Sequence, residues 1–169
     1  PEGKDLRTAT HAVMQYIQYS KCENEAAVSR EIDRLVSENY ITADQAKLVN
    51  CGQIADFFAT DFGKRIRNHP QVLREFKFSI LDSGSRYDPS LAGEQVLLQG
   101  VVDCALLEED GITVIDFKTD RVSDSTLPDA VGRYRPQVDV YADALSRIYG
   151  RKIKAKYLYF FKLGQFVEV

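Results

Sequence analysis

The chain has 169 residues, of which 44% are hydrophobic, so it is long enough to fold around a single core. Its 22 basic and 25 acidic residues give a formal net charge of −3, which excludes a protein that holds nucleic acid by bulk positive charge. No run of about 18 apolar residues predicts a membrane span, and the first residues contain no apolar signal-peptide core, so we expect no membrane partner.

Helices are predicted for the first seventy residues. Apolar residues recur there every three to four positions between charged ones, as at Val28 and Ile32, and three or four helices fit the segment. Asn24 is placed to cap one helix, and Thr42 with Gln45 matches the capping box of another.

Strands are predicted after Pro70. Three segments alternate between apolar and polar residues or are rich in Val and Leu, and the turn signal Glu109-Asp110-Gly111 joins the last two into a hairpin. The predicted strands cover residues 72–80, 95–108 and 112–118. The polar segment 82–93 between the first two is expected to be an exposed loop.

A long helix and two further strands are predicted next. After a loop over 119–128, apolar residues at helical spacing predict a helix over 129–149, which Gly150 ends. Its apolar side is formed by Val138, Tyr141, Leu145 and Ile148. The last two strands, 154–163 and 165–169, are separated by one glycine.

This order of elements predicts one domain of the α/β class. Helices, three strands, a helix and two strands are typical of a mixed sheet flanked by helices. Residues 1–70 would form its helical part and residues 71–169 its sheet core.

Three cysteines lie far apart in the sequence. Cys22, Cys51 and Cys104 form no CxxC metal motif, and an odd number does not suit a disulfide framework. Four thiolates are the usual ligands of an iron–sulfur cluster, so we expect none in this chain. Partly buried, reduced thiols in a cytoplasmic protein are predicted.

Two aspartates interrupt apolar strand sequences. Asp103 follows Gly-Val-Val, and Asp116 lies within Val-Ile-Asp-Phe. If the two strands pair through the predicted turn, both side chains can point to one side of the hairpin. A carboxylate in such a place is costly unless it is paired or bound to a metal, and two carboxylates repel each other. A hard divalent cation such as Mg²⁺ is the simplest remedy.

Lys118 lies two residues beyond Asp116 and therefore faces the same side of the strand. Beside a metal-activated water, an ammonium can orient the nucleophile and offset negative charge on phosphate oxygens. The alternative is an Asp–Lys ion pair that stabilises a sheet edge, which an isolated DxK favours. Asp103 upstream shifts the interpretation toward catalysis.

The ordered motifs resemble a known family. The GVVD that ends at Asp103, the DFK at 116–118 and the QVDVY at 137–141 are similar to the GxxD, DxK and QxxxY signature of the RecB-like branch of the PD-(D/E)xK nuclease superfamily. His11 matches the histidine upstream of this signature. The similarity runs from about Arg7 to the last strand and is closest to the C-terminal nuclease domains of AddA-type helicase-nucleases. It implies a restriction-endonuclease-like fold.

The resemblance also implies residue roles. His11, Asp103, Asp116 and the main-chain carbonyl of Phe117 would be metal ligands, and Lys118 would be the catalytic lysine. Carboxylates suit Mg²⁺, and an imidazole ligand also suits Mn²⁺.

Two further positions bear on this site. Glu75 matches a glutamate often found before the GxxD strand, and the alternative is a charge at a strand edge. The family commonly has glycine four residues before its histidine, where this chain has Arg7. The arginine removes backbone freedom at the approach to His11.

The predicted long helix carries candidate DNA-supporting residues. Gln137 and Tyr141 are four apart and share one face, which is also typical of an ordinary amphipathic helix with one polar residue. By resemblance they support the DNA strand or the active-site loop, and Arg133 and Arg135 would contact phosphates. The basic segment 64–67 is a second candidate, although such runs are more typical of a solvated helix end.

The resemblance implies a DNA exonuclease. It would be the nuclease domain of an AddAB-type ATP-dependent helicase-nuclease, which acts on single strands from an unwound duplex in double-strand break repair and recombination. No GxxxxGK[ST] motif is present, so no ATP site is expected in this chain; the helicase part would lie elsewhere in the same polypeptide, beside an AddB-type partner. Two alternatives stay open: a stand-alone RecB-like exonuclease of phage or CRISPR type, and a catalytically silent DNA-binding or assembly module.

Overall fold

Five strands form one mixed sheet within residues 2–169, the part of the chain that this computed structural model describes; Pro1 lies outside it. The strands are β1 (Val72–Ser83), β2 (Gln95–Glu108), β3 (Gly111–Lys118), β4 (Ile153–Phe160) and β5 (Gln165–Glu168), and they lie in this order across the sheet. β3 and β4 run parallel, and every other neighbouring pair runs antiparallel. The predicted α/β fold with a mixed sheet is confirmed.

Five α-helices precede the sheet within the described residues, one more than the highest number predicted. They are α1 (Glu2–Tyr16), α2 (Glu25–Ser37), α3 (Ala43–Leu48), α4 (Cys51–Ala59) and α5 (Asp61–Arg67). The two predicted caps, Asn24 and the Thr42 capping box, are confirmed. The additional division arises because Asn50 and Thr60 also cap short helices through their side chains.

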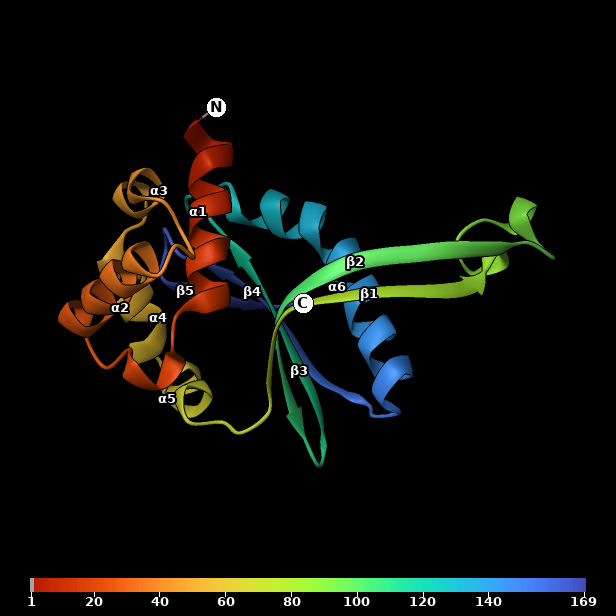
Figure 1. Cartoon of the computed structure of the whole chain (residues 1–169). Coiled ribbons are helices and arrows are strands. Elements are labelled where there is room, and N and C mark those ends of the chain that lie inside the picture. Colours follow the sequence, from red (N-terminus) through yellow and green to blue (C-terminus); the bar gives the residue numbers. More distant parts are fainter. Residues whose placement is uncertain (1) are drawn as a thin grey trace.

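The sheet lies between two helical layers. α1 to α5 gather on one side, and the long helix α6 (Leu127–Tyr149) covers the other (Figure 1). Along β2 and β3, alternate residues face opposite layers: Leu106 and Phe117 pack among the first helices, whereas Ala105 and Val114 pack against α6. Every residue of β3 is buried, which explains its nearly continuous apolar sequence.

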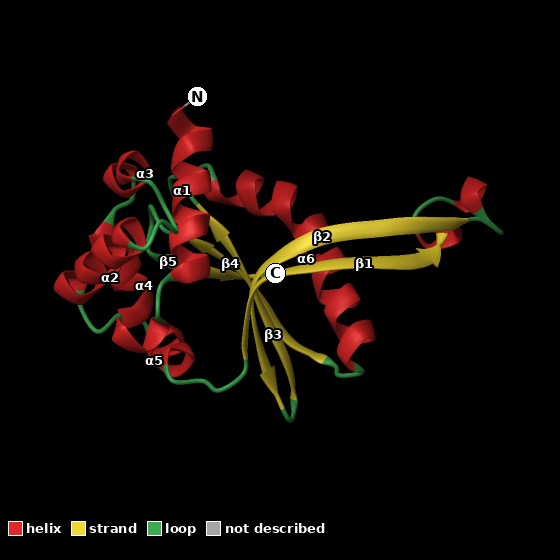
Figure 2. Ribbon diagram, in the orientation of Figure 1, coloured by secondary structure: helices red, strands yellow, loops and turns green. Residues whose placement is uncertain are grey.

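β1 and β2 continue beyond the sheet as a two-stranded ribbon, here called the arm (Figures 1 and 2). β2 pairs with β3 only from Cys104 to Glu108, whereas its pairing with β1 runs on to Gln95. The base of the arm is therefore the place where β2 loses one of its two neighbours.

The connection at the tip of the arm differs from the predicted loop. β1 extends to Ser83, and two short 3-10 turns follow. Asp82 is buried rather than exposed, because its carboxylate accepts hydrogen bonds from the hydroxyl of Tyr87 (2.7 Å) and from Arg86 (3.1 Å).

α6 begins slightly earlier than predicted. It starts at Leu127, because Pro128 is well suited to a first helical turn, and it ends at Gly150 in the left-handed conformation (φ 63°). Ile148 was predicted on the apolar side but is 43% exposed, since the last turns meet the sheet through Leu145 and Tyr149 instead.

The C-terminal strands are shorter than predicted. β4 ends at Phe160, where the N–H of Gly164 donates to the Phe160 carbonyl and turns the chain toward β5. No helix among residues 2–169 combines the length and apolar character needed to cross a bilayer. The three thiols are free, with Cys22 and Cys104 buried.

Candidate active site

Asp103 and Asp116 lie opposite each other at the base of the arm. Asp103 is on β2 and Asp116 is on β3, each one step beyond the paired residues Cys104 and Ile115. The side chains are 10% and 7% exposed. The register of the hairpin thus brings two nearly buried carboxyl groups together, as the strand pattern requires.

The Asp103 carboxylate is held by two neighbours. Its Oδ2 accepts a hydrogen bond from the main-chain N–H of Phe117 (2.8 Å) and lies 3.1 Å from Nε2 of His11. Burial raises the pKa of Asp103, but hydrogen bonds from His11 and from Asp116 outweigh it and lower the pKa below its ordinary value. Burial lowers the pKa of His11, whereas its hydrogen bond with Asp103 raises it, and the net shift is upward.

Asp116 is protonated more readily than an ordinary aspartate. Burial raises its pKa to about 7, with further contributions from the hydrogen bond and the negative charge of Asp103. The Lys118 ammonium lies 2.9 Å from Asp116 Oδ2 and opposes this shift without cancelling it. At neutral pH the pair of aspartates therefore comes close to holding one proton between the two carboxyl groups.

Lys118 is only 6% exposed and packs on an aromatic ring. Its Nζ lies 3.8 Å from the centre of the Tyr134 ring, and the Tyr134 hydroxyl donates to Oδ2 of Asp120 (2.5 Å). The sequence motifs assigned no role to Tyr134, which lies between the predicted phosphate contacts Arg133 and Arg135. Its spacing of three residues before Gln137, on the same helix face, was the available signal.

Gln137 and Tyr141 contact each other in the same cleft as the two aspartates. Nε2 of Gln137 donates to the Tyr141 hydroxyl (2.7 Å). Tyr141 also explains the glycine of the GVVD segment: a Cβ on Gly100 would lie 2.6 Å from Cε1 of Tyr141 and 2.9 Å from the ring of Phe78. The strand and the helix can approach this closely because position 100 has no side chain.

A cleft of 540 Å³ opens over these residues. The predicted site residues that line it are His11, Glu75, Asp103, Asp116, Lys118, Gln137 and Tyr141. Glu75 lies across from Asp103 on β1 with φ 47°, an uncommon conformation for this residue type. Burial and then the charge of Asp103 raise the pKa of Glu75.

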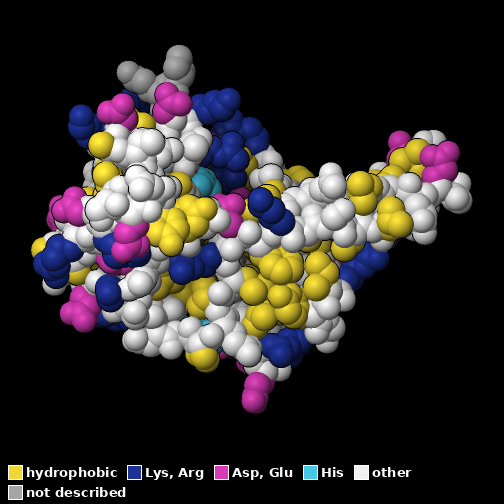
Figure 3. Space-filling model, in the orientation of Figure 1, with side chains coloured by type: hydrophobic (Ala, Val, Ile, Leu, Met, Phe, Trp, Pro, Cys, Tyr) yellow, Lys and Arg dark blue, Asp and Glu magenta, His cyan; other side chains and the backbone are white. Residues whose placement is uncertain are grey.

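His11 reaches the cleft from α1, which continues without a break through Arg7. Nδ1 of His11 is hydrogen-bonded to the Arg7 carbonyl (2.8 Å), which leaves Nε2 directed at Asp103. In Figure 3, Lys and Arg side chains gather over the upper part of α1 and the start of α6, next to a histidine. Phe117 contacts the site through its N–H, while its ring packs on Phe57 of α4 in the core beneath the first five helices.

Two groups of predicted DNA contacts lie outside the cleft. Neither Arg133 nor Arg135 lines it, and Arg133 lies 3.9 Å from Asp120. The basic segment 64–67 on α5 also lies elsewhere, and two of its arginines form ion pairs. The ion pairs and the position of segment 64–67 agree with a solvated helix end.

The donor set suits a hard divalent cation. Within residues 2–169, no three His, Cys, Asp or Glu side chains are already arranged around one point as metal ligands. However, buried Oδ2 of Asp116 accepts no hydrogen bond of normal geometry. The site holds two adjacent carboxyl groups and an imidazole, and one of the carboxyl groups is protonated near neutral pH. A divalent cation can replace that proton.

The chain resembles proteins much longer than itself. It is 36% identical over 167 residues to an ATP-dependent helicase/nuclease subunit from Clostridium botulinum strain Hall, covering 96% of this chain and 13% of that protein. It is 35% identical over 176 residues to the protein of the same name from Alkaliphilus metalliredigens, covering 99% of this chain and 15% of that protein. The chain thus spans 13% to 15% of the length of these relatives.

Two further comparisons concern a solved structure and a protein family. A solved structure titled "Crystal structure of SSO0001" is 14% identical, with a TM-score of 0.43 over 99% of this chain and 73% of that one, which is too distant to support an argument about function. Residues 4–167 match the PD-(D/E)XK nuclease superfamily. A match of this extent shows that the chain belongs to the PD-(D/E)XK nuclease superfamily.

Proposed function

We propose that this chain is a metal-dependent deoxyribonuclease domain that hydrolyses phosphodiester bonds from a DNA end. The observation that carries the proposal is the placement of Asp103, Asp116 and Lys118 in one cleft, with the pKa of Asp116 raised to about 7. A structural ion pair needs one carboxylate for one ammonium. A second carboxylate at the same point adds repulsion, which is typical of a cation site.

The proposed ligands are His11, Asp103, Asp116 and the main-chain carbonyl of Phe117. A divalent cation bound to them, Mg²⁺ or Mn²⁺, supplies positive charge to the scissile phosphate and makes a nearby water more acidic. The Lys118 ammonium is fixed between Asp116 and the Tyr134 ring, so it is available to orient the attacking water and to stabilise negative charge on phosphate oxygens.

Other residues of the cleft would place the substrate. Gln137 and Tyr141 are proposed to hold the DNA strand over the aspartates, since both residues line the cleft and their polar groups are hydrogen-bonded to each other. Glu75 is proposed as an accessory acid–base group on the opposite wall. Arg133 and Arg135 remain proposed phosphate contacts for DNA that extends beyond the cleft.

The proposed setting is an AddAB-type ATP-dependent helicase-nuclease. The relatives are named helicase/nuclease subunits and are several times longer than this chain, which supports a helicase part in the same polypeptide. An AddB-type partner, single strands delivered by unwinding, and a role in double-strand break repair and recombination belong to the same proposal.

The test is cleavage of end-labelled single-stranded DNA in Mg²⁺, Mn²⁺ or EDTA. We expect shortening from one end that requires the metal and is lost in Asp116→Asn and Lys118→Met. The Lys118→Met protein should still gain thermal stability from the metal, whereas Asp116→Asn should not. If the wild-type chain binds DNA but leaves it intact with every divalent ion, the silent binding module is the better description.

A further inference from the structure

We propose that a groove beside the catalytic cleft holds the single-stranded DNA next to the scissile phosphate; this rests on the proposed function. The groove consists of two adjoining cavities of 690 and 170 Å³. Its walls are α1, the segment from the end of α3 to the first turn of α4, the residues that follow β3, and the residues that follow β4. We call it the α1 groove.

The α1 groove is continuous with the cleft. Arg7 lines both the cleft and the larger cavity, and Thr119 and Arg121 closely follow Lys118 on the chain. The two cavities themselves share Leu6, Leu48, Thr119 and Arg121. A polymer bound at the aspartates can therefore continue along α1 without leaving the surface.

The rim of the α1 groove is basic, although the whole chain has a net charge of −3. Lys4, Arg7, Arg121 and Lys162 line it, and Asp120 is the one acidic residue among the described lining residues. None of the four basic side chains forms an ion pair with another residue in the described part of the chain. Asp120 accepts the Tyr134 hydroxyl, so its charge is partly engaged. Unpaired cations along a groove suit a polyanion.

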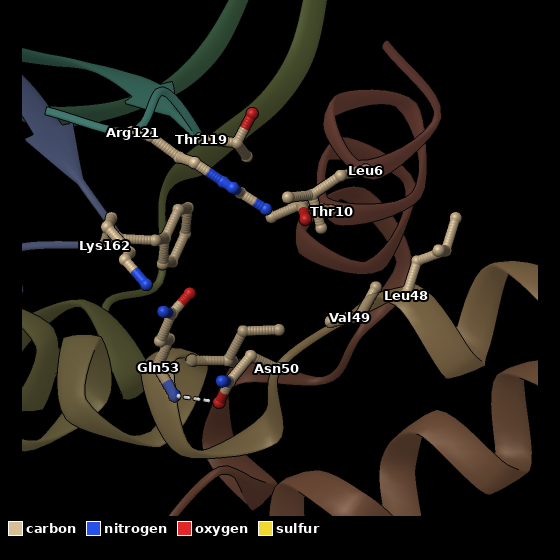
Figure 4. Close-up of a pocket in the computed structure, with 11 residues that line it drawn as sticks. Leu6, Thr10, Leu48, Val49, Asn50, Gln53, Thr119, Arg121 and Lys162 are labelled. Carbon is tan, nitrogen blue, oxygen red and sulfur yellow. Dashed lines mark hydrogen bonds between the residues drawn. The ribbon is translucent and has the colours of Figure 1, made fainter. Parts of the chain in front are cut away.

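The floor of the groove carries two accessible apolar side chains, since Leu48 is 43% exposed there and Leu6 is half-buried. Val49 and Ile54 also line it but are themselves buried. Figure 4 shows Arg121 reaching across toward Leu6 of α1, while Lys162 points toward Gln53 on another wall.

The apolar side chains of the floor and the basic side chains of the rim together favour single-stranded DNA over a duplex. Unpaired bases can lay their faces on aliphatic side chains while the phosphates meet the rim, whereas a duplex keeps its bases stacked inside. Arg121 and Lys162 are the residues of choice for a test, because both are exposed and have no described ion pair. The groove is thus assigned to unpaired nucleotides adjacent to the cleavage site.

The experiment measures binding of a fluorescein-labelled oligothymidylate to the full chain in EDTA, where no cleavage interferes. We compare wild type with the double variant Arg121→Gln/Lys162→Gln over a range of salt concentrations. The expected result is a Kd increased about tenfold or more at low salt, and a slope of log Kd against log salt that is smaller by about 1.4, corresponding to two lost phosphate contacts.

A matched control is Arg30→Gln/Lys152→Gln. Both residues are exposed, form no described ion pair and lie away from the groove, on α2 and at the end of the sheet opposite Lys118. This variant should bind within about twofold of wild type. Equal melting temperatures of all variants exclude unfolding as the cause.

Two results would overturn the inference: unchanged affinity and salt slope in the groove variant, or an equal loss of affinity for a blunt duplex of the same length. Neither result depends on catalysis. If the wild-type chain never cleaves DNA, the proposed nuclease activity is rejected. If binding of single-stranded DNA still falls only in the groove variant, the assignment of the groove to single-stranded DNA holds.

Discussion

The ammonium of Lys118 lies 3.8 Å from the centre of the Tyr134 ring, so the lysine is held by an aromatic face as well as by Asp116. A cation–π contact of a buried ammonium contributes on the order of 1–2 kcal/mol. Tyr134→Leu should therefore lower kcat about 5- to 30-fold, because Lys118 is no longer fixed in place.

The matched variant is Tyr134→Phe, which keeps the ring and loses the hydrogen bond to Asp120. It should retain most of the activity, and both variants should keep the stabilisation by metal. Equal losses in the two variants, or a fall in metal affinity, would argue against a positioning role for the ring.

The pH dependence of metal binding follows from Asp116. The folded protein holds this proton up to a pH of about 7, whereas the unfolded chain releases it near the ordinary aspartate pKa of 3.8. The contribution of Asp116 to the free energy of unfolding of the metal-free protein should therefore fall as the pH rises from about 4 to about 7.

A cation must displace the same proton and also the proton of His11, whose pKa is raised, so Mn²⁺ affinity should rise by up to about tenfold per pH unit for each proton displaced and level off once both groups are deprotonated. Calorimetric titrations from pH 5.5 to 8.5 measure this. A flat affinity over the range would contradict the shared proton.

Asp116→Asn separates a cation site from a structural ion pair. In EDTA the asparagine amide can donate to Asp103 as the protonated carboxyl does, so the variant should melt at the wild-type temperature or above. Added Mn²⁺ should stabilise wild type but not the variant. If Asp116 serves Lys118 alone, its loss instead leaves a buried ammonium unpaired and lowers stability by about 3 kcal/mol.

Gly100→Ala should destabilise the base of the arm. The added methyl would meet Tyr141 at 2.6 Å and Phe78 at 2.9 Å, and overpacking of this kind costs about 1–3 kcal/mol. Gly132→Ala is the control, because nothing lies within 4 Å of a Cβ there and alanine favours the helix by about 1 kcal/mol. Urea unfolding of both variants tests the contrast, and equal stability of Gly100→Ala and wild type would refute the close approach.

The sequence predicts the central hairpin because its information is local. Continuous apolar residues, one turn signal and a period of two place Asp103 and Asp116 on the same side of paired strands. Likewise, Thr42 and Gln45 mark a helix start through contacts only three residues apart.

Longer-range features could not be obtained in this way. The contact between Tyr134 and Lys118 depends on how α6 is rotated against the sheet, which no short pattern specifies. The burial of Asp82 depends on two arginines from different elements, Arg86 after β1 and Arg147 on α6, and the second lies 65 residues later in the chain. The groove beside α1 likewise requires four separate segments to be placed in space.

The hydrogen bond from the Phe117 amide to Asp103 has a practical consequence for spectroscopy. This N–H donates to the same oxygen that contacts His11, just beyond Cys104 and Ile115, where the pairing of β2 with β3 ends. Its chemical shift and its rate of exchange with solvent deuterium should therefore follow the charge on the Asp103 carboxylate. This backbone amide in a buried strand would therefore report the protonation of Asp103 and the binding of the proposed metal there, without an extrinsic group attached to the protein.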